Sequence, residues 1–290
     1  MNTIYKQILS AGKLLDYTIK FLFTSLLVLA SLTAQAGVQG SRHDLGTGGT
    51  GQNAGGTDEV CVFCHTPHGS DTSAAVPLWN KVLPGAGTYT RYSTLNTSSL
   101  DGTEVPVGSV SLACLSCHDG AQGMDVVINA PGSTATDTTL YDLGGIALNG
   151  AIAMTNAAGD NVPMLGTDLT DDHPISIAYA GGGCVGGDAD GATFTSAVFG
   201  DPDFNTAQKD TINTNPVWWV DNGGVGTREK TDMHLYTRTD NVVAGEPSVE
   251  CGSCHDPHND STFSAVAPKS VAFLRVSNAA SIICTTCHIK

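Results

Sequence analysis

Hydrophobic residues along this chain fall into short runs rather than into long amphipathic stretches. The longest apolar run is Phe21 to Leu32, near the N-terminus. Further along, apolar and β-branched residues form short segments bounded by Gly, Asn, Asp and Thr, a pattern typical of strands joined by loops. These segments cover residues 124–130, 175–180, 215–220 and 233–237. Helical periodicity is sparse, so we expect a mostly irregular chain with short helices and a few β-hairpins.

Residues 1–36 have the pattern of an export signal. Lysines 6, 13 and 20 precede the apolar run, and Ala34–Ala36 follows it as a small-x-small cleavage site. The run is shorter than the ~20 residues that span a bilayer, and an uncleaved anchor is the alternative. No Cys follows the cleavage site directly, so lipoprotein processing is not expected. We therefore expect a mature chain of residues 37–290 without a membrane span. It is secreted and either extracellular or at the cell surface, or otherwise periplasmic.

The charge balance limits the partners of the mature chain. The whole chain has 13 basic and 28 acidic residues, and residues 1–36 hold three Lys and one Asp. The mature part therefore has 10 basic and 27 acidic residues, a net charge of −17. Such a surface repels nucleic acid and anionic lipid. The 34 Gly, together with few Leu, Ile and Phe, do not favour a large aliphatic core.

Eight of the nine cysteines form four C-x-x-C pairs, and each pair is followed at once by a histidine. The pairs are Cys61/Cys64, Cys114/Cys117, Cys251/Cys254 and Cys284/Cys287, followed by His65, His118, His255 and His288. C-x-x-C-H is the attachment signature of c-type haem. The spacing places both thiols on one side of a helical turn and aims the histidine at the iron. Four-cysteine zinc sites or disulfides are the alternatives, but neither explains the four histidines. We predict four covalently attached haem c groups.

Five histidines remain beyond these four proximal ligands. They are His43, His68, His173, His234 and His258. Four irons need four distal ligands, so the supply leaves one histidine over. An iron with histidine on both faces is low-spin, has a low reduction potential and has no open site. Methionines 124, 154, 164 and 233 are alternative ligands, but the number of histidines makes them unnecessary.

His68 follows His65 by three residues, and His258 follows His255 by the same interval. Three residues span at most ~10 Å, and a proline before each second histidine stiffens the path. The second histidine cannot reach the opposite face of its neighbour's iron. If His68 and His258 are ligands, each binds a different haem and brings two haems close together. The alternative is a solvated histidine, which the repeated pattern makes less plausible.

Each half of the chain contains one C-x-x-C-H-x-P-H and one plain C-x-x-C-H. The first half contains four histidines, with His43 and His68 as distal candidates, but the second contains only three. Its fourth must come from the middle, where His173 and His234 are the candidates. His173 is favoured because the acidic residues before it, Asp171 and Asp172, can hold the other ring nitrogen of a ligand. His234 lies in a strand-like segment, where a histidine is usually solvated.

Eight short motifs occur in a specific order along the chain. They are SRHDLG (41–46), CVFCHTPH (61–68), PLWN (77–80), CLSCHDG (114–120), DDHPI (171–175), CGSCHDPH (251–258), FLR (273–275) and CTTCHIK (284–290). This order resembles the doubled C-x-x-C-H multihaem cytochromes. It is especially similar to the tetrahaem extracellular cytochrome filaments of metal-reducing bacteria. The resemblance covers about residues 41–128, 171–178 and 249–290.

The resemblance implies distal ligation by four of the remaining histidines. They are His43, His68, His173 and His258. In filament-forming relatives, one distal histidine reaches the haem of the neighbouring subunit. The sequence departs from the resemblance in the glycine-rich segment 181–191 and in the pair Trp218–Trp219. Cys184 in that segment is either an unmodified thiol or the site of an intermolecular disulfide or metal contact.

Together these features predict one tetrahaem cytochrome domain whose core is built from haems. Its haem-binding halves are about 41–128 and 249–290, and about 129–248 is an intervening excursion.

The expected function is electron transfer through closely stacked bis-histidine haems. Expected partners are other subunits of itself in a head-to-tail filament, and redox proteins or extracellular electron acceptors. The alternatives are a soluble periplasmic carrier, a mainly structural haem protein, and a multihaem reductase with one open haem. Since every iron can be filled, we do not expect an enzyme.

Overall fold

The computed structural model divides the chain into two compact units, residues 1–36 and residues 37–290. The boundary coincides with the expected cleavage site, but the first unit lies outside the described residues. The structure describes residues 37–46, 48–49, 57–121, 124, 126–129, 141–142, 154–155, 161–162, 164–182, 201–223, 227–241, 245–259 and 273–289. Within these ranges, no helix is both long enough and apolar enough to cross a membrane.

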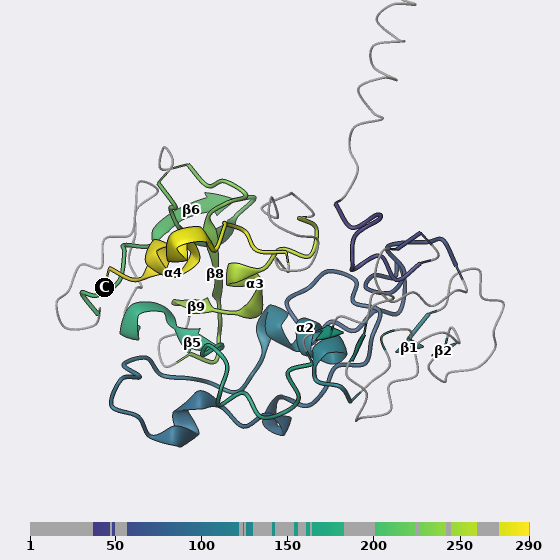
Figure 1. The fold of residues 1–290 in the computed structure, drawn as a ribbon, viewed down its shortest axis with the longest axis horizontal. Helices are drawn as coiled ribbons and strands as arrows, with labels where there is room; N and C mark the ends of the chain where they lie inside the picture. Colours follow the sequence, from purple (N-terminus) through teal and green to yellow (C-terminus); the bar gives the residue numbers. More distant parts are fainter. Residues whose placement is uncertain are drawn as a thin grey trace, which may run out of the picture. The chain divides into compact units, whose positions relative to one another are not determined.

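Each C-x-x-C-H motif lies on a short helical turn (Figure 1), where turns were predicted. The first motif closes a turn through hydrogen bonds from the Cys64 and His65 amides to the Cys61 carbonyl. The other three motifs end the described α-helices, which are α2 (Ser109–His118), α3 (Cys251–Cys254) and α4 (Ile282–Cys287). Single 3₁₀ turns lie at Ala86–Thr88, Tyr92–Leu95, Tyr179–Gly181 and Ala279–Ser281. One helical turn is enough to bring the first thiol of each motif beside the second thiol and the histidine.

An antiparallel sheet of five strands is the largest regular element of the described residues. Its strands, in spatial order, are β5 (Ile177–Ala178), β9 (Pro247–Val249), β8 (Met233–Thr237), β7 (Asn215–Val220) and β6 (Gln208–Ile212). Asn213 and Thr214 join β6 to β7, and both have positive φ, as a two-residue type I′ hairpin turn requires. Two smaller pairs are formed by β1 (Val126–Val127) with β2 (Tyr141–Asp142) and β3 (Met154–Thr155) with β4 (Asn161–Val162).

The strand predictions match the structure unevenly. The hydrophobic pattern predicts strands over 215–220 and 233–237, and β7 and β8 occupy these residues. The predicted strands over 124–130 and 175–180 are each reduced to two residues. The five-stranded sheet is larger than the few hairpins that we expected. Its outer pairing joins β5 to β9, about 70 residues later, so the local pattern could not indicate it.

Three small hydrophobic clusters form the interior of the described part of the chain, and attachment cysteines pack against each of them. The sheet cluster includes Tyr179, Trp218 and Leu235, with Cys254 and Cys287 against it. A second cluster, around Trp79 and Leu115, contacts Cys64. The third consists of Leu45, Phe63 and Met124, with Cys64 and Cys117 against it. The chain therefore supplies hydrophobic packing of its own around the motifs.

The sheet changes the expected organisation of the second half. Residues 129–248 were predicted to be an excursion away from the haem-binding halves. In the structure, hydrophobic side chains of β7 and β8 from this segment pack with Cys254, Val276 and Cys287. The described part of the segment is thus integral to the C-terminal half. A physical reason is that the 42 residues from 249 to 290 hold too few apolar side chains to bury a core alone.

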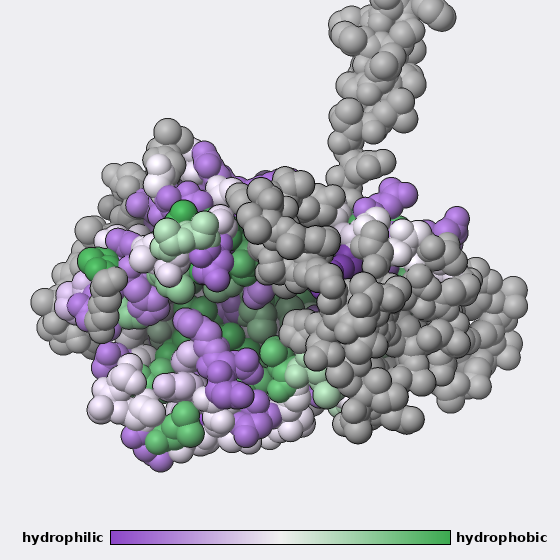
Figure 2. Space-filling view, viewed as in Figure 1, coloured by the Kyte–Doolittle hydropathy of each residue, from purple (hydrophilic) through white to green (hydrophobic). Residues whose placement is uncertain are grey.

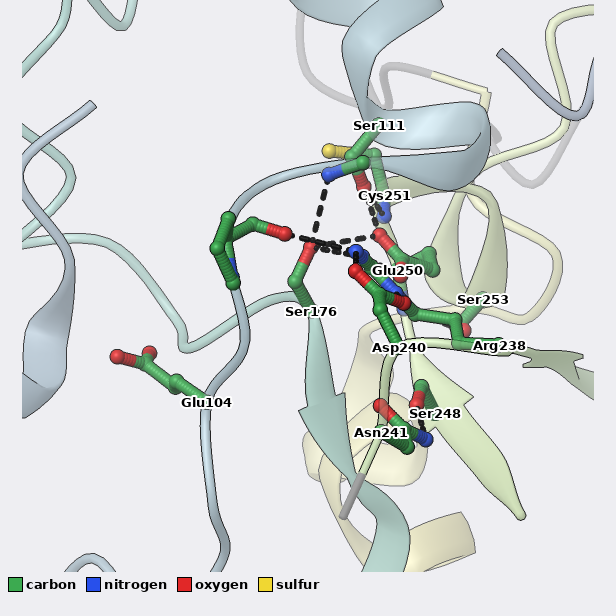
Figure 3. A network of polar contacts seen from close by, with 12 residues as sticks. Glu104, Ser111, Ser176, Arg238, Asp240, Asn241, Ser248, Glu250, Cys251 and Ser253 are labelled. Carbon is green, nitrogen blue, oxygen red and sulfur yellow. Dashed lines mark hydrogen bonds and ion pairs between the residues drawn. The ribbon is translucent and has the colours of Figure 1, made fainter. Parts of the chain in front are cut away.

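A buried ion pair connects the sheet to two motif helices (Figure 3). The Arg238 guanidinium, just after β8, lies 2.9 Å from the Glu250 carboxylate, and their side chains are only 4% and 0% exposed. Glu250 immediately precedes α3 and also accepts hydrogen bonds from Ser111 of α2 and from Ser176. Ser111 accepts a hydrogen bond from the Cys251 amide. Burial raises the pKa of Glu250, and the hydrogen bonds from Ser111 and Arg238 oppose that rise.

Removing one partner of this pair should be strongly destabilising. Arg238→Met leaves the Glu250 carboxylate buried without its guanidinium, so we expect the free energy of unfolding to fall by about 3–5 kcal/mol. The double variant Arg238→Met/Glu250→Met removes both charges and should recover most of that loss. Chemical denaturation followed by circular dichroism measures both effects, with Lys230→Met at an exposed position as the control. A double variant as unstable as the single one would contradict this electrostatic explanation.

Candidate haem-binding site

The paired cysteines of successive motifs lie close to one another. The structure describes all eight of them, whereas Cys184 lies outside the described residues. The Cys114 thiol donates a hydrogen bond to Cys251. This hydrogen bond and burial both raise the pKa of Cys114. The same hydrogen bond lowers the pKa of Cys251 against the opposing effect of burial. Cys64 interacts electrostatically with Cys117, and Cys254 interacts with Cys284 and Cys287. The first and second, second and third, and third and fourth attachment turns are therefore neighbours.

Burial keeps several of these thiols neutral. It raises the pKa of Cys64 to about 12, that of Cys254 to about 11 and that of Cys287 to about 12. Reactive and redox cysteines need a thiolate at neutral pH. These three side chains are therefore protonated thiols at neutral pH.

The metal-ligand geometry of the described residues differs from that of a zinc site. A structural zinc ion needs four Cys or His ligands that converge on one point. In the ranges that the structure describes, no three His, Cys, Asp or Glu side chains converge in this way. A haem iron needs only two ligands from the protein, because the porphyrin supplies the other four of its six.

Three histidine pairs have the spacing of two ligands to one iron. A metal–imidazole bond is about 2.0 Å long, and the nitrogen lies about 1.15 Å from its ring centre, so ring centres on opposite faces of one iron are roughly 6.3 Å apart. The observed separations are 6.3 Å for His43–His118, 6.2 Å for His65–His258 and 6.4 Å for His173–His288. The interplanar angles of 77°, 12° and 61° are all compatible, since each ring can rotate about its bond to the metal. Each pair joins the histidine of a motif to a predicted distal ligand.

The second ring nitrogen of three of these histidines already has an oxygen partner. His65 Nδ1 lies 2.8 Å from the Pro77 carbonyl and His173 Nδ1 lies 3.0 Å from the Pro174 carbonyl. His258 Nδ1 lies 3.6 Å from Asp256, which raises the pKa of His258. Metal-ligating histidines commonly donate their other N–H to such oxygens, which leaves Nε2 for the metal. For His173 the partner is a carbonyl, so the suggested role of Asp171 or Asp172 is wrong.

His43 has a ring suited to metal binding in its neutral form. Burial, and then the nearby His118, lower its pKa to about 4, so the imidazole keeps a lone pair at neutral pH. Phe273 stacks on it with ring centres 4.0 Å apart. Its Nδ1 is buried without a hydrogen-bond partner among the described residues. An orphaned ring nitrogen of this kind fits a site that a ligand completes.

His234 is held differently. It lies on β8, with Nδ1 3.1 Å from an Arg228 nitrogen and Nε2 3.3 Å from the Glu229 carbonyl. Burial, with Arg275 and Arg228 nearby, lowers its pKa to about 4. Both ring nitrogens are engaged by the chain itself, so His234 has none directed to an iron. This geometry favours His173 over His234 as the ligand from the middle of the chain.

His68 is exposed, while the backbone around it is held in place. Its carbonyl accepts hydrogen bonds from Thr66 and from Asn129, at 3.1 and 2.7 Å. Among the described residues, no aromatic ring contacts the His68 ring. When the three pairs and His234 are set aside, the remaining histidines are His68 and His255, both exposed.

Large hydrophobic side chains beside the first and last motifs are exposed. Leu78 (49%) accepts a backbone hydrogen bond from Thr66, next to His65, and Val82 (47%) lies four residues further along the chain. Ile282 (41%) and Ile289 (59%) flank the fourth motif. On the face shown in Figure 2, green hydrophobic residues line a hollow in the described part of the chain. An apolar macrocycle attached at these motifs would cover such side chains, so the residues present fit the group that the motifs predict.

No family model matches the chain, and no curated protein matches it. The candidate site therefore depends on the motif spacing and on the geometry of the histidine and cysteine side chains.

The sequence missed two contributors to this site. Asp256 was overlooked as the partner of His258, although it lies within the repeated C-x-x-C-H-x-P-H motif. Lys81 was also overlooked because nothing in its local sequence distinguishes it from a solvated lysine. The Lys81 side chain is fully buried and interacts electrostatically with Cys64 and Cys117 of the first two attachment turns.

Proposed function

We propose that the mature chain is an exported tetrahaem c-type cytochrome for extracellular electron transfer. The eight paired cysteines would attach four haems, and the histidines of the motifs would be proximal ligands. The observation that carries this proposal is the 6.2–6.4 Å spacing of three histidine pairs, each with one member from a motif. Bound haem with histidine on both faces supplies reversible one-electron transfer and no open coordination position.

In this proposal the protein residues orient the ligands and exclude water. His43 would serve the second motif, His258 the first and His173 the fourth. The carbonyls of Pro77 and Pro174 would hold the rings of His65 and His173, respectively, in one tautomer. Neighbouring attachment turns, such as those of Cys114 and Cys251, keep the four sites close together.

We further propose that a second copy of the chain is the main partner, in a head-to-tail filament. The count of histidines assigns His68 to the motif of His255. His68 is exposed, and its neighbours Thr66 and Asn129 hold its backbone at the surface. We propose that it binds the haem of the next subunit, which places the first motif of one subunit beside the third motif of another. Contacts of this kind that do not close into a ring produce a filament. Extracellular acceptors or redox proteins are the remaining partners of this proposal.

Intact mass and spin state test this function together. Protein exported by a host that attaches c-type haem should exceed the mass of peptide 37–290 by four haem masses, and its assembled form should be entirely low-spin when oxidised. The matched variant Cys251→Ala/Cys254→Ala should carry three haems. Three or fewer haems in mature wild-type protein would refute the assignment. A substantial high-spin signal in the assembled form would instead favour a reductase with one open iron.

A further inference from the structure

An aromatic side chain from the C-terminal half of the chain lies flat on a predicted haem ligand from the N-terminal half. The rings of Phe273 and His43 are stacked, with ring centres 4.0 Å apart and planes inclined by 15°. The His118 ring is the other member of this ligand pair, and it lies at 77° to the His43 ring. One ligand of the second motif is therefore in contact with a residue that follows the third.

The backbone holds Phe273 in place against the third motif. Its carbonyl accepts a hydrogen bond from the Asp256 amide at 2.8 Å, and the next residue, Leu274, pairs with His255 in an isolated β-bridge. Phe273 has a φ of 57°, in the left-handed region that large side chains rarely occupy. Such a conformation persists only where the surrounding contacts impose it, so the position of Phe273 is set by the packing around it.

The loop that carries His43 is also held by hydrogen bonds. The Asp44 side chain accepts from the amides of Gly40 and Gly46 at 2.8 and 3.0 Å, and Asp44 is only 1% exposed. The His43 amide donates to the Ser41 hydroxyl oxygen at 3.1 Å. Both members of the stack thus extend from backbone that is fixed by hydrogen bonds.

The stack restricts how the His43 ring can turn. A ring bound to a metal through one nitrogen can in general rotate about that bond. The separation of 4.0 Å between the ring centres is already within the ~3.5–4.0 Å at which carbon atoms are in optimal contact. A large rotation would therefore push the edge of the imidazole into the phenyl ring. Phe273 keeps the His43 plane nearly parallel to its own, and in this orientation the plane is close to perpendicular to that of His118.

The angle between two axial imidazole planes affects the electronic structure of a low-spin ferric iron. Each imidazole raises the energy of the iron d orbital that overlaps its π system, and the plane of the ring selects that orbital. Parallel rings raise one orbital above its partner, whereas perpendicular rings raise both about equally. Two nearly equal orbitals give a highly anisotropic paramagnetic resonance signal, and two separated orbitals give a rhombic one. Separation also stabilises the ferric form, so perpendicular rings make the iron easier to reduce.

We propose that Phe273 is a positioning residue that holds the His43 plane close to perpendicular to the His118 plane, and so sets the electronic structure of the haem of the second motif. The inference rests on the proposed function, since it concerns a haem that the motifs predict. The haem of the first motif is the contrasting case, because its two ligand rings lie at 12° to each other. Phe273 acts through His43 and is not a ligand.

Low-temperature electron paramagnetic resonance of the oxidised, haem-loaded protein tests this role. The haem of the second motif should give a highly anisotropic low-spin signal, which is identified as the low-spin signal that His43→Ala abolishes. Phe273→Leu removes the flat face but keeps an apolar side chain. In this variant the signal should broaden and shift toward the rhombic range while the iron stays low-spin.

Two further variants serve as controls. Phe273→Tyr keeps the aromatic ring and should retain the wild-type signal. Phe204→Leu also removes a phenyl ring, but Phe204 contacts His288 of the fourth motif, with ring centres 4.3 Å apart. Its loss should leave the signal of the second-motif haem unchanged.

The outcomes separate this inference from the proposed function. Phe273→Leu with four attached haems and an unchanged second-motif signal would overturn the role of Phe273 and leave the function standing. A rhombic signal from this haem in the wild type would do the same. Conversion of this haem to high-spin in Phe273→Leu would also overturn it, because Phe273 would then keep His43 on the iron rather than set its plane. Wild-type protein without four haems would overturn the function, and the inference with it. If Phe273→Leu does not accumulate, Phe273→Met also lacks a flat face and should show the same shift.

Discussion

Replacing His173 with alanine is expected to convert about a quarter of the iron in the oxidised protein from low-spin to high-spin. The His173 ring lies 6.4 Å from the His288 ring, the spacing of two ligands to one iron, and the Pro174 carbonyl holds its Nδ1. Its loss should open one coordination position at the fourth haem. Low-temperature electron paramagnetic resonance measures the fraction directly.

His234→Ala is the matched control for this experiment. His234 is the other histidine of the middle segment, but its two ring nitrogens are engaged by Arg228 and Glu229. Its loss should leave the spectrum unchanged and cost only about 1 kcal/mol of stability for the missing hydrogen bonds. If His234→Ala produced the high-spin signal and His173→Ala did not, the assignment of the middle ligand would be wrong.

His68→Ala is expected to abolish filaments while all four haems remain attached. The product should be a soluble monomer with one high-spin iron, since the cysteines and the other seven proposed ligands are unchanged. The physical reason is that an iron–histidine bond between subunits fixes both their distance and their orientation, and its removal leaves only the weaker contacts around it. Electron microscopy of the secreted material and sedimentation of the purified protein measure this loss, and His234→Ala again serves as the control.

The decisive comparison for His68 uses the wild-type protein at low concentration. If its ligand role is between subunits, dilution to monomers should expose one high-spin iron. Monomeric wild-type protein that already shows four low-spin haems would mean that every ligand is internal. In that case His68 would bind a haem of its own subunit, and the filament would need another type of contact.

The sequence by itself determined the features that need only neighbouring residues. The four C-x-x-C-H motifs place two thiols and an imidazole on one helical turn, so their positions and turns could be predicted from spacing alone. Strands β7 and β8 were also predictable, since their patterns lie within 215–220 and 233–237. The reach of three residues is also local, and it prevents His68 from binding the same iron as His65.

Only the tertiary structure decided which distant residues meet. It brings His43 to His118 and His173 to His288, it gives His173 a carbonyl partner in place of an aspartate, and it joins β5 to β9. It also buries Lys81, which the local sequence does not distinguish from a surface lysine. The physical reason is common to all of these. Contacts between segments far apart in the chain are set by the packing of the whole molecule, and local hydrophobic periodicity carries no information about that packing.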